Sequence, residues 1–248
     1  CLALLALPLL LAACATAPKG ATNAAADREP DEYDADDVLL RNHDVPHVVV
    51  AEAFVTASTP DDNIDSPASW LQDGKLMLVA SAKATDQLVV YDGDTGKRLR
   101  TVGGSGKALG KLSRPNGIAT IDDRFVFVVE RDNRRVQMFQ LPEFTPLLTF
   151  GEEALQQPYG LWVRRKGAGY EVLVSDAYMA GEDAKGDDIV PPLAQLDRRF
   201  RRYEVVQADG KWSVQAAGVW VRCCLAYRGS ARSACAKPCS EIRPTTAC

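Results

Sequence analysis

The sequence predicts an all-β fold, an incomplete β-propeller in which about three to three and a half blades are present. The first observation behind this prediction is a repeat, because a proline-centred opening recurs at Pro67, Pro115 and Pro158, at intervals of 48 and 43 residues. The second is that short apolar runs and turns follow each opening. A period of about 40–50 residues with three or four short strands is typical of a propeller blade. Neighbouring blades must stack, since one blade cannot bury both of its faces alone.

The apolar runs place the strands of each unit. The predicted strands are 75–80, 87–91 and 97–102 in the first unit, 124–129, 135–139 and 146–150 in the second, and 170–174, 198–206 and 211–215 in the third. The last two flank Ala208-Asp-Gly210, which is a hairpin signal. The acidic insertion 181–188 interrupts the third unit. It is interpreted as a solvated loop, although its carboxylates could also bind a metal ion.

Composition limits the function classes. The chain has 248 residues, of which 46% are hydrophobic and 25% charged, as in an ordinary soluble domain. A net charge of −4 argues against nucleic acid as a partner. The glycine-rich stretch 103–112 lacks the spacing of a phosphate-binding loop and is not followed by a helix pattern. We therefore interpret it as a link between blades.

The N-terminus predicts a targeting segment. Residues 1–13 form an uncharged apolar run that is too short to span a bilayer and is typical of a signal peptide. Leu11-Ala-Ala-Cys14 resembles a bacterial lipobox, which implies cleavage before Cys14 and acylation of its thiol. The alternative is secretion after cleavage at an Ala-x-Ala-like site. Lipidation would place the protein in the bacterial cell envelope, on the periplasmic or outer-membrane face, held to the membrane only by lipid.

Residues 14–52 are predicted to be the lipid-anchored linker. Seven of the eleven residues from Asp27 to Asp37 are acidic, and such a run stays solvated and extended. His43 and His47 are interpreted as exposed linker residues, because Pro46 breaks the helix on which they could share a metal.

Two family resemblances cover the repeats, predicted to occupy residues 53–216. Gly104–Ala119 followed by Val128–Phe139 resembles an NHL-type propeller repeat, which is informative about fold but says little about chemistry. Asp62–Trp70 resembles the opening of the β-propeller phytases, and the segments that resemble that family's first blade are 81–83, 88–92 and 96–97. Asn116 and Gly160 also fit the family pattern. This second resemblance implies a six-bladed ring and a calcium-dependent phosphomonoesterase that releases phosphate from inositol hexakisphosphate.

The phytase resemblance also implies the site residues. They are Lys83 and Arg131 as phosphate-binding cations, Tyr159 as a residue that approaches substrate, and Asp61, Asp62 and Asp65 as calcium ligands. Calcium held by carboxylates can bridge phosphate oxygens and activate water, while Lys and Arg neutralise the anion. Structural roles are the competing interpretation: a strand-end lysine, a surface arginine paired with Asp132, a tyrosine packed at a blade corner and a solvated acidic turn. The expected partner is a phosphorylated small molecule.

The chain departs from the phytase pattern in two places. After Val174 the family would place a further substrate lysine, but the next lysine here is Lys185. The segment 217–248 is rich in cysteine and arginine and has no alternating strand pattern. We expect a change of reading frame there, with a disulfide-rich cap as the alternative, whereas zinc binding is poorly supported. The NHL-like second unit and the missing lysine favour the alternative function, a non-catalytic NHL-like propeller lipoprotein that binds a protein or ligand.

Overall fold

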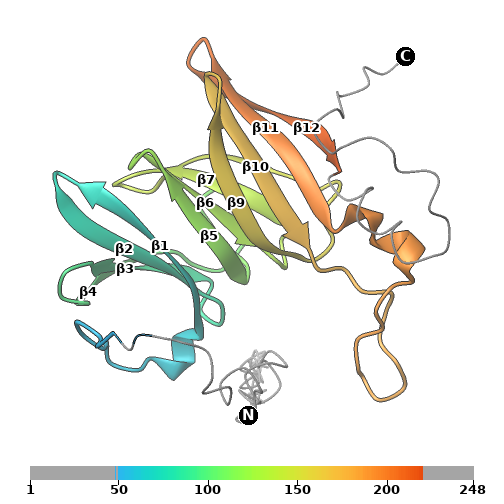
Figure 1. Cartoon of the computed structure of the whole chain (residues 1–248), viewed down its shortest axis with the longest axis horizontal. Helices are drawn as coiled ribbons and strands as arrows, with labels where there is room; N and C mark the ends of the chain where they lie inside the picture. Colours follow the sequence, from blue (N-terminus) through green and yellow to red (C-terminus); the bar gives the residue numbers. More distant parts are fainter. Residues whose placement is uncertain (1–47, 49, 220–248) are drawn as a thin grey trace, which may run out of the picture. The chain divides into compact units, whose positions relative to one another are not determined.

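The computed structural model describes residues 48 and 50–219 (Figure 1). The chain divides into two units, Cys1–Glu52 and Ala53–Cys248, and every helix and strand described below belongs to the second. The described part of this unit is all-β and contains three antiparallel four-stranded sheets. Its short 3-10 helices are η2 (Pro60–Asp62) and η3 (Leu193–Arg198). Among the described residues, no helix is long and apolar enough to cross a membrane.

Each sheet is formed by four strands that are consecutive in the chain. The first sheet contains β1 (Ile64–Gln72), β2 (Lys75–Ala82), β3 (Gln87–Asp92) and β4 (Arg98–Gly103). The second contains β5 (Pro115–Ile121), β6 (Phe125–Glu130), β7 (Arg135–Gln140) and β8 (Thr145–Phe150). The third contains β9 (Pro158–Lys166), β10 (Gly169–Asp176), β11 (Phe200–Ala208) and β12 (Lys211–Val219).

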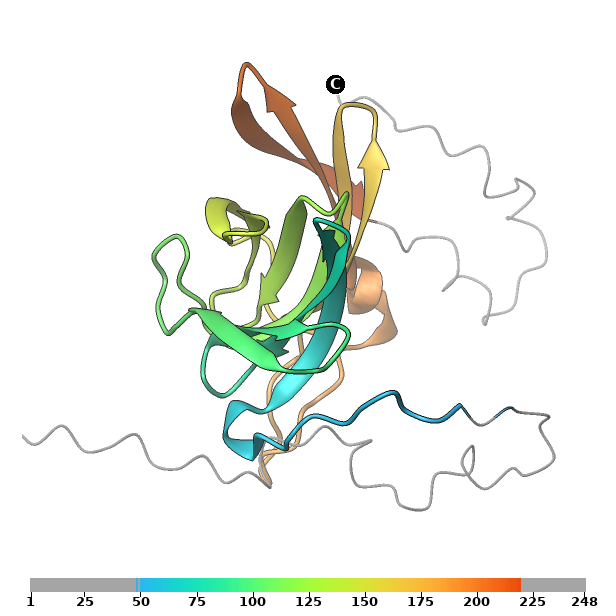
Figure 2. The same cartoon turned by 90° about the vertical axis from the view of Figure 1, so that its left-hand side faces the viewer.

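The sheets pack through their faces, and their first strands are neighbours: β5 contacts both β1 and β9 (Figures 1 and 2). Successive residues of a strand point to opposite faces, so β6 serves two hydrophobic cores. Val126 and Val128 pack toward the first sheet, whereas Phe125, Phe127 and Val129 pack toward the third. Each such side chain contributes about 1.5–3 kcal/mol by leaving water. This double burial explains why β6 is a continuous apolar run.

The predicted repeat is present, but its alignment on prolines was wrong in the first unit. Pro115 and Pro158 each pair with the last residue of the second strand in their sheet, Glu130 and Asp176. In the first sheet the residue that pairs with the last residue of the second strand, Ala82, is Ile64. The repeat therefore runs from Ile64 to Pro115 to Pro158, and Pro67 lies beyond the register shift of β1. Proline suits the first position of a strand, where its missing N–H costs no ladder hydrogen bond. The openings are thus the first strands β1, β5 and β9, which gives each unit four strands.

Two other expectations need correction. An incomplete propeller predicts exposed apolar residues at its two ends, namely Leu76, Leu78 and Val79 at one end and Val172, Leu173 and Val174 at the other. Val79, Val172 and Val174 are instead fully buried between neighbouring sheets, and the three leucines are half-buried. The predicted start of the atypical tail at residue 217 is also too early, because β12 continues through Val219. The described residues form three four-stranded sheets, which falls within the predicted three to three and a half units, and these sheets do not close into a ring.

The connections between sheets match the predicted links. The glycine-rich stretch joins β4 to β5, with an isolated bridge between Ser105 and Leu112 and no helix after it. The acidic insertion 181–188 is an exposed loop between β10 and η3. Within it, the Asp183 carboxylate accepts hydrogen bonds from the backbone amides of Lys185 and Asp187 at 2.8 and 3.0 Å. These bonds lower the pKa of Asp183.

Candidate functional site

One backbone hydrogen bond recurs in all three sheets and defines equivalent positions. The amides of Lys83 and Arg131 donate to the carbonyl oxygens of Asn63 and Arg114, each at 3.1 Å. In the third sheet the amide of Ala177 donates to Gln157 at 2.8 Å. The residue after the second strand is therefore a cation in two sheets and an alanine in the third. The structure thus places the two predicted phosphate-binding residues at one repeated position.

The first strands contribute a second set of equivalent residues. Asp65, Asn116 and Tyr159 each occupy the second position of β1, β5 and β9. The first and second sheets are in register here, because the Thr120 hydroxyl of β5 donates a hydrogen bond to the Ser69 carbonyl oxygen of β1. Asn116 precedes Thr120 by the same number of residues as Asp65 precedes Ser69, so these two residues also lie at matching positions. The starts of the three first strands therefore meet at the same edge as the ends of β2, β6 and β10.

Close packing between the second and third sheets supports this convergence. An added Cβ at Gly117 would lie only 2.7 Å from the Tyr159 carbonyl oxygen and 2.8 Å from the Gly160 Cα. The absence of a side chain at Gly117 therefore lets the starts of β5 and β9 approach. Aligning the prolines in the sequence could not reveal that Asp65, Asn116 and Tyr159 are equivalent. Their equivalence depends on the register shift near the start of each first strand.

The individual side chains differ in their exposure. Lys83 is buried, with 3% exposure, and its ammonium lies 3.8 Å from an Asp65 carboxylate oxygen. Arg131 and Tyr159 are half-buried. Asn116 has 1% exposure, yet neither of its amide atoms has a hydrogen-bond partner within the described part of the chain. An unsatisfied buried amide of this kind requires an explanation, and a bound polar group is one.

A buried ionic cluster holds the strand end that carries Arg131. The carboxylate of Glu130, the preceding residue, accepts hydrogen bonds from the side chains of Arg135 at 2.6 Å, Asn133 at 2.5 Å and Gln137 at 3.0 Å. Burial raises the pKa of Glu130, and the hydrogen bonds and the Arg135 charge offset only part of that effect. Arg135 also donates to the carbonyl oxygens of Lys107 and Lys111, which ties the link between the first two sheets to β7.

The predicted calcium ligands are engaged in other ways. Asp61 is exposed, whereas Asp62 is buried and accepts hydrogen bonds from Arg98 at 2.6 Å and Thr85 at 3.1 Å. Burial by itself raises the pKa of Asp62, but these bonds and the Arg98 charge outweigh it, and the pKa lies below its ordinary value. Asp65 forms an ion pair with Lys83. No group of three or more Asp, Glu, His or Cys side chains placed to hold a metal occurs among the described residues. These three carboxylates therefore do not fit a calcium site as they stand.

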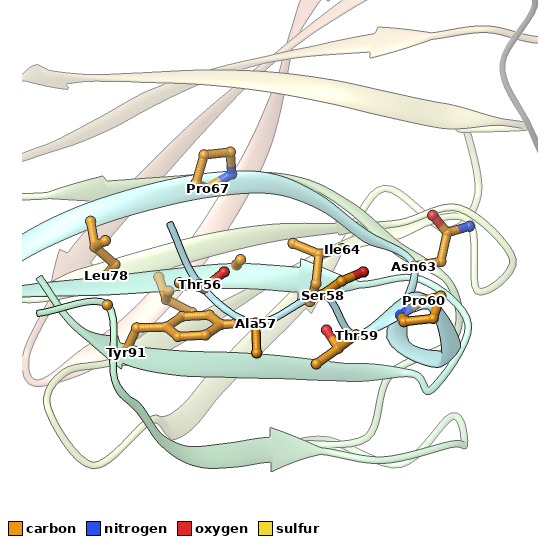
Figure 3. A pocket seen from close by; sticks show the side chains of 13 residues that line it. Thr56, Ala57, Ser58, Thr59, Pro60, Asn63, Ile64, Pro67, Leu78 and Tyr91 are labelled. Carbon is orange, nitrogen blue, oxygen red and sulfur yellow. The ribbon is translucent and has the colours of Figure 1, made fainter. Parts of the chain in front are cut away.

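One cavity lies on the face of the first sheet that points away from the second sheet. It has a volume of about 470 Å³ and lies between the segment Thr56–Pro60 and the sheet, where Leu78 and Tyr91 line it (Figure 3). None of the described residues that line it carries a charge. It lacks the chemistry for a phosphorylated ligand, and we assign the candidate site to the strand ends instead.

Some predicted residues lie outside the described part of the chain. They are the proposed lipidation site Cys14, the linker histidines His43 and His47, and the cysteine-rich segment beyond residue 219.

Comparisons with known proteins leave the family open. No family model matches the chain, and no curated protein matches it. Among the solved structures that resemble it weakly are Kuenenia stuttgartiensis hydrazine synthase, with 14% identity over 64% of this chain and a TM-score of 0.38, and U3-55K, with 15% identity over 61% and a TM-score of 0.38. The matches cover 47% and 48% of those two chains, so this chain spans about half their length. Similarity at this level supports no inference about function.

Proposed function

We propose that the three sheets are blades of a six-bladed β-propeller of phytase type and that their shared strand-end site binds the phosphate groups of a small molecule. The single observation that carries the binding proposal is the equivalence of Lys83 and Arg131. Two cations at one repeated position suit a ligand that carries more than one anionic group, because each blade can then neutralise one group. Inositol phosphates belong to this class of ligand.

The neighbouring polar residues suit the same ligand. The Asn116 amide could donate to a phosphate oxygen and thereby satisfy its buried hydrogen-bonding group. Tyr159 occupies the equivalent place in the third sheet, where Ala177 supplies no cation. We therefore propose that Lys83, Arg131 and Asn116 bind phosphate and that Tyr159 lies against the ligand.

We extend this proposal to a calcium-dependent phosphomonoesterase that acts on inositol hexakisphosphate. Bound calcium would supply charge neutralisation and an activated water. Asp61, Asp62 and Asp65 do not form a ligand set, so holding the ion would need other oxygen donors. The proposed setting is the bacterial cell envelope, with the protein anchored by a lipid on Cys14.

Calorimetric titration of the full chain with inositol hexakisphosphate tests the binding proposal. Lys83→Met and Arg131→Gln should each weaken binding at least tenfold, whereas Arg124→Gln, an exposed cation at the opposite end of β6, should leave it unchanged. Equal loss in all three variants would show a non-specific charge effect and reject the site. A circular-dichroism spectrum like that of the parent protein confirms that each variant is folded.

Phosphate release with calcium and with excess chelator tests the chemistry separately. Calcium-dependent release that falls at least tenfold in Lys83→Met, about 1.4 kcal/mol of transition-state stabilisation, supports the enzyme. Binding without release supports the second candidate, a non-catalytic propeller lipoprotein that presents this site to a ligand or protein partner. Ala177 at the third cationic position favours this second candidate.

A further inference from the structure

A second cavity lies between the second and third sheets, away from the strand-end site. It has a volume of about 330 Å³, within the lower range of small-molecule pockets. The lining residues that bear on its chemistry are Phe150, Gly151, Glu153, Tyr203, Trp212 and Ala216. They come from β8 and the segment after it on one side, and from β11 and β12 on the other.

The corresponding gap between the first two sheets is closed by the chain itself. There the longer link between β4 and β5 folds against β7, with the Gly110 amide donating to the Gln137 side chain at 2.6 Å and Gln137 donating to the Lys111 carbonyl at 3.0 Å. The link between β8 and β9 is shorter and leaves the cavity open. The hollow is therefore a property of this interface and not of stacked sheets in general.

Three aromatic rings line the cavity. Phe150 and Tyr203 make an edge contact with their ring centroids 5.1 Å apart, and Trp212 is held in place by an edge contact with Phe125 at 5.2 Å and by stacking on Tyr170. Rings of this kind attract organic cations through their negative faces. Glu153 is the only charged residue among the described lining residues, and it is exposed. Aromatic walls with one carboxylate at the rim favour an ammonium group over an anion.

A buried hydroxyl specifies the other end of the ligand. Tyr203 has 2% exposure, and its hydroxyl has no hydrogen-bond partner among the described residues. A Cβ added at Gly151 would lie 3.3 Å from this oxygen, so the hydroxyl reaches the wall formed by the chain after β8. Burial raises the pKa of Tyr203 to about 12, and the phenol therefore stays protonated and can donate. A ligand oxygen would satisfy it.

We propose that this cavity binds a small quaternary ammonium compound that carries a hydroxyl or ester oxygen, that is, a molecule of the choline class. The ammonium lies against Trp212, Tyr203 and Phe150 beside the Glu153 carboxylate. The ligand oxygen accepts a hydrogen bond from the Tyr203 hydroxyl. This proposal does not depend on the phosphate site.

Calorimetry of the full chain with choline and with 3,3-dimethylbutanol, its uncharged isostere, tests the proposal. Choline should bind at least tenfold more tightly than the isostere. Glu153→Gln should weaken choline binding about fivefold, whereas Glu143→Gln, an exposed glutamate in another turn, should not. Equal binding of choline and its isostere, or equal effects of the two glutamine variants, would overturn the proposal.

Two tryptophan variants of β12 provide a further test without removing core packing. Ala216→Trp fills the cavity, whereas Gln215→Trp adds the same bulk on the opposite face of the strand. Only the first should abolish choline binding, and loss in both or in neither would contradict the assignment. Flotation with phosphatidylcholine and phosphatidylglycerol vesicles then identifies the source of the ligand. Preference for phosphatidylcholine that disappears in Glu153→Gln indicates a lipid headgroup, and choline binding without this preference indicates a free ligand.

Discussion

The buried pair Glu130–Arg135 and the surface pair Asp122–Arg165 have the same closest nitrogen–oxygen distance in different surroundings. In each pair the closest nitrogen–oxygen distance is 2.6 Å, but the arginine side chain has 5% exposure in the first pair and 61% in the second. Changing Arg135 to Gln leaves a buried carboxylate without its counter-charge, which costs about 3–5 kcal/mol. Arg165→Gln should cost at most about 1 kcal/mol, because water already solvates that pair.

Urea unfolding of the full chain, followed by circular dichroism, measures this difference. With a slope of about 2 kcal/mol per molar urea, Arg135→Gln should lower the midpoint by about 1.5–2.5 M. That loss is a large part of the roughly 5–15 kcal/mol that stabilises a typical domain. The double variant Glu130→Gln/Arg135→Met should recover part of the stability, because neither partner is then left as an uncompensated buried charge. Equal midpoint shifts in Arg135→Gln and Arg165→Gln would refute the reasoning that burial decides the cost.

Two further predictions concern acid stability and the N-terminus. A hydrogen bond from Lys75, supported by Thr95, lowers the pKa of Asp92 to about 2, and a hydrogen bond from Tyr170 lowers that of Asp122. The unfolded chain then binds more protons than the folded one below about pH 4, so stability should fall from about pH 4 toward pH 2, and Asp92→Asn should make the fall shallower in a pH series of thermal melts. Cys14 should carry lipid, and mass spectrometry that finds an unmodified mature peptide beginning at Ala15 or later would exclude it.

The sequence predicted the second, third and fourth strands of the first two sheets because their apolar runs are dense. It missed β1, β5 and β9 as strands because their starts contain residues such as Asp65, Asn116 and Gly117 that are typical of turns. These same residues belong to the candidate site. Lys83 and Arg131 directly follow a second strand, and Asp65, Asn116 and Tyr159 lie near the start of a first strand, whereas Asp61 and Asp62 lie in η2.

The environment of the site could not be predicted from local sequence. Asp62 was expected to bind calcium because it lies in an acidic run, but its partner Arg98 comes from β4, and three strands lie between the two residues in the sequence. Asn116 was noted only as a match in spacing, and its unsatisfied burial follows from the packing of three sheets. The cavity beside Tyr203 likewise depends on how much of the gap between the second and third sheets is filled by the link between β8 and β9. Such properties arise from contacts between distant segments, which spacing along the chain does not encode.

The two outer faces of the described sheets place different demands on any neighbour that would complete the proposed ring. On the first sheet the outer face carries Leu76, Leu78 and Tyr91, and the Thr56–Pro60 segment already lies against part of it. On the third sheet the buried Glu171 carboxylate lies 2.5 Å from Arg164 and 3.4 Å from Arg202.

Lys166 lies 3.8 Å from the same carboxylate, so three cations surround Glu171, and Glu204 pairs with one of them. A sheet that packed here with an apolar face like those of the two internal interfaces would bury the half-exposed Arg164 and Lys166 without enough counter-charge, which is strongly unfavourable. A next blade on this side must therefore supply carboxylates of its own. A next blade on the side of the first sheet needs an apolar face and must either displace the Thr56–Pro60 segment or fit around it.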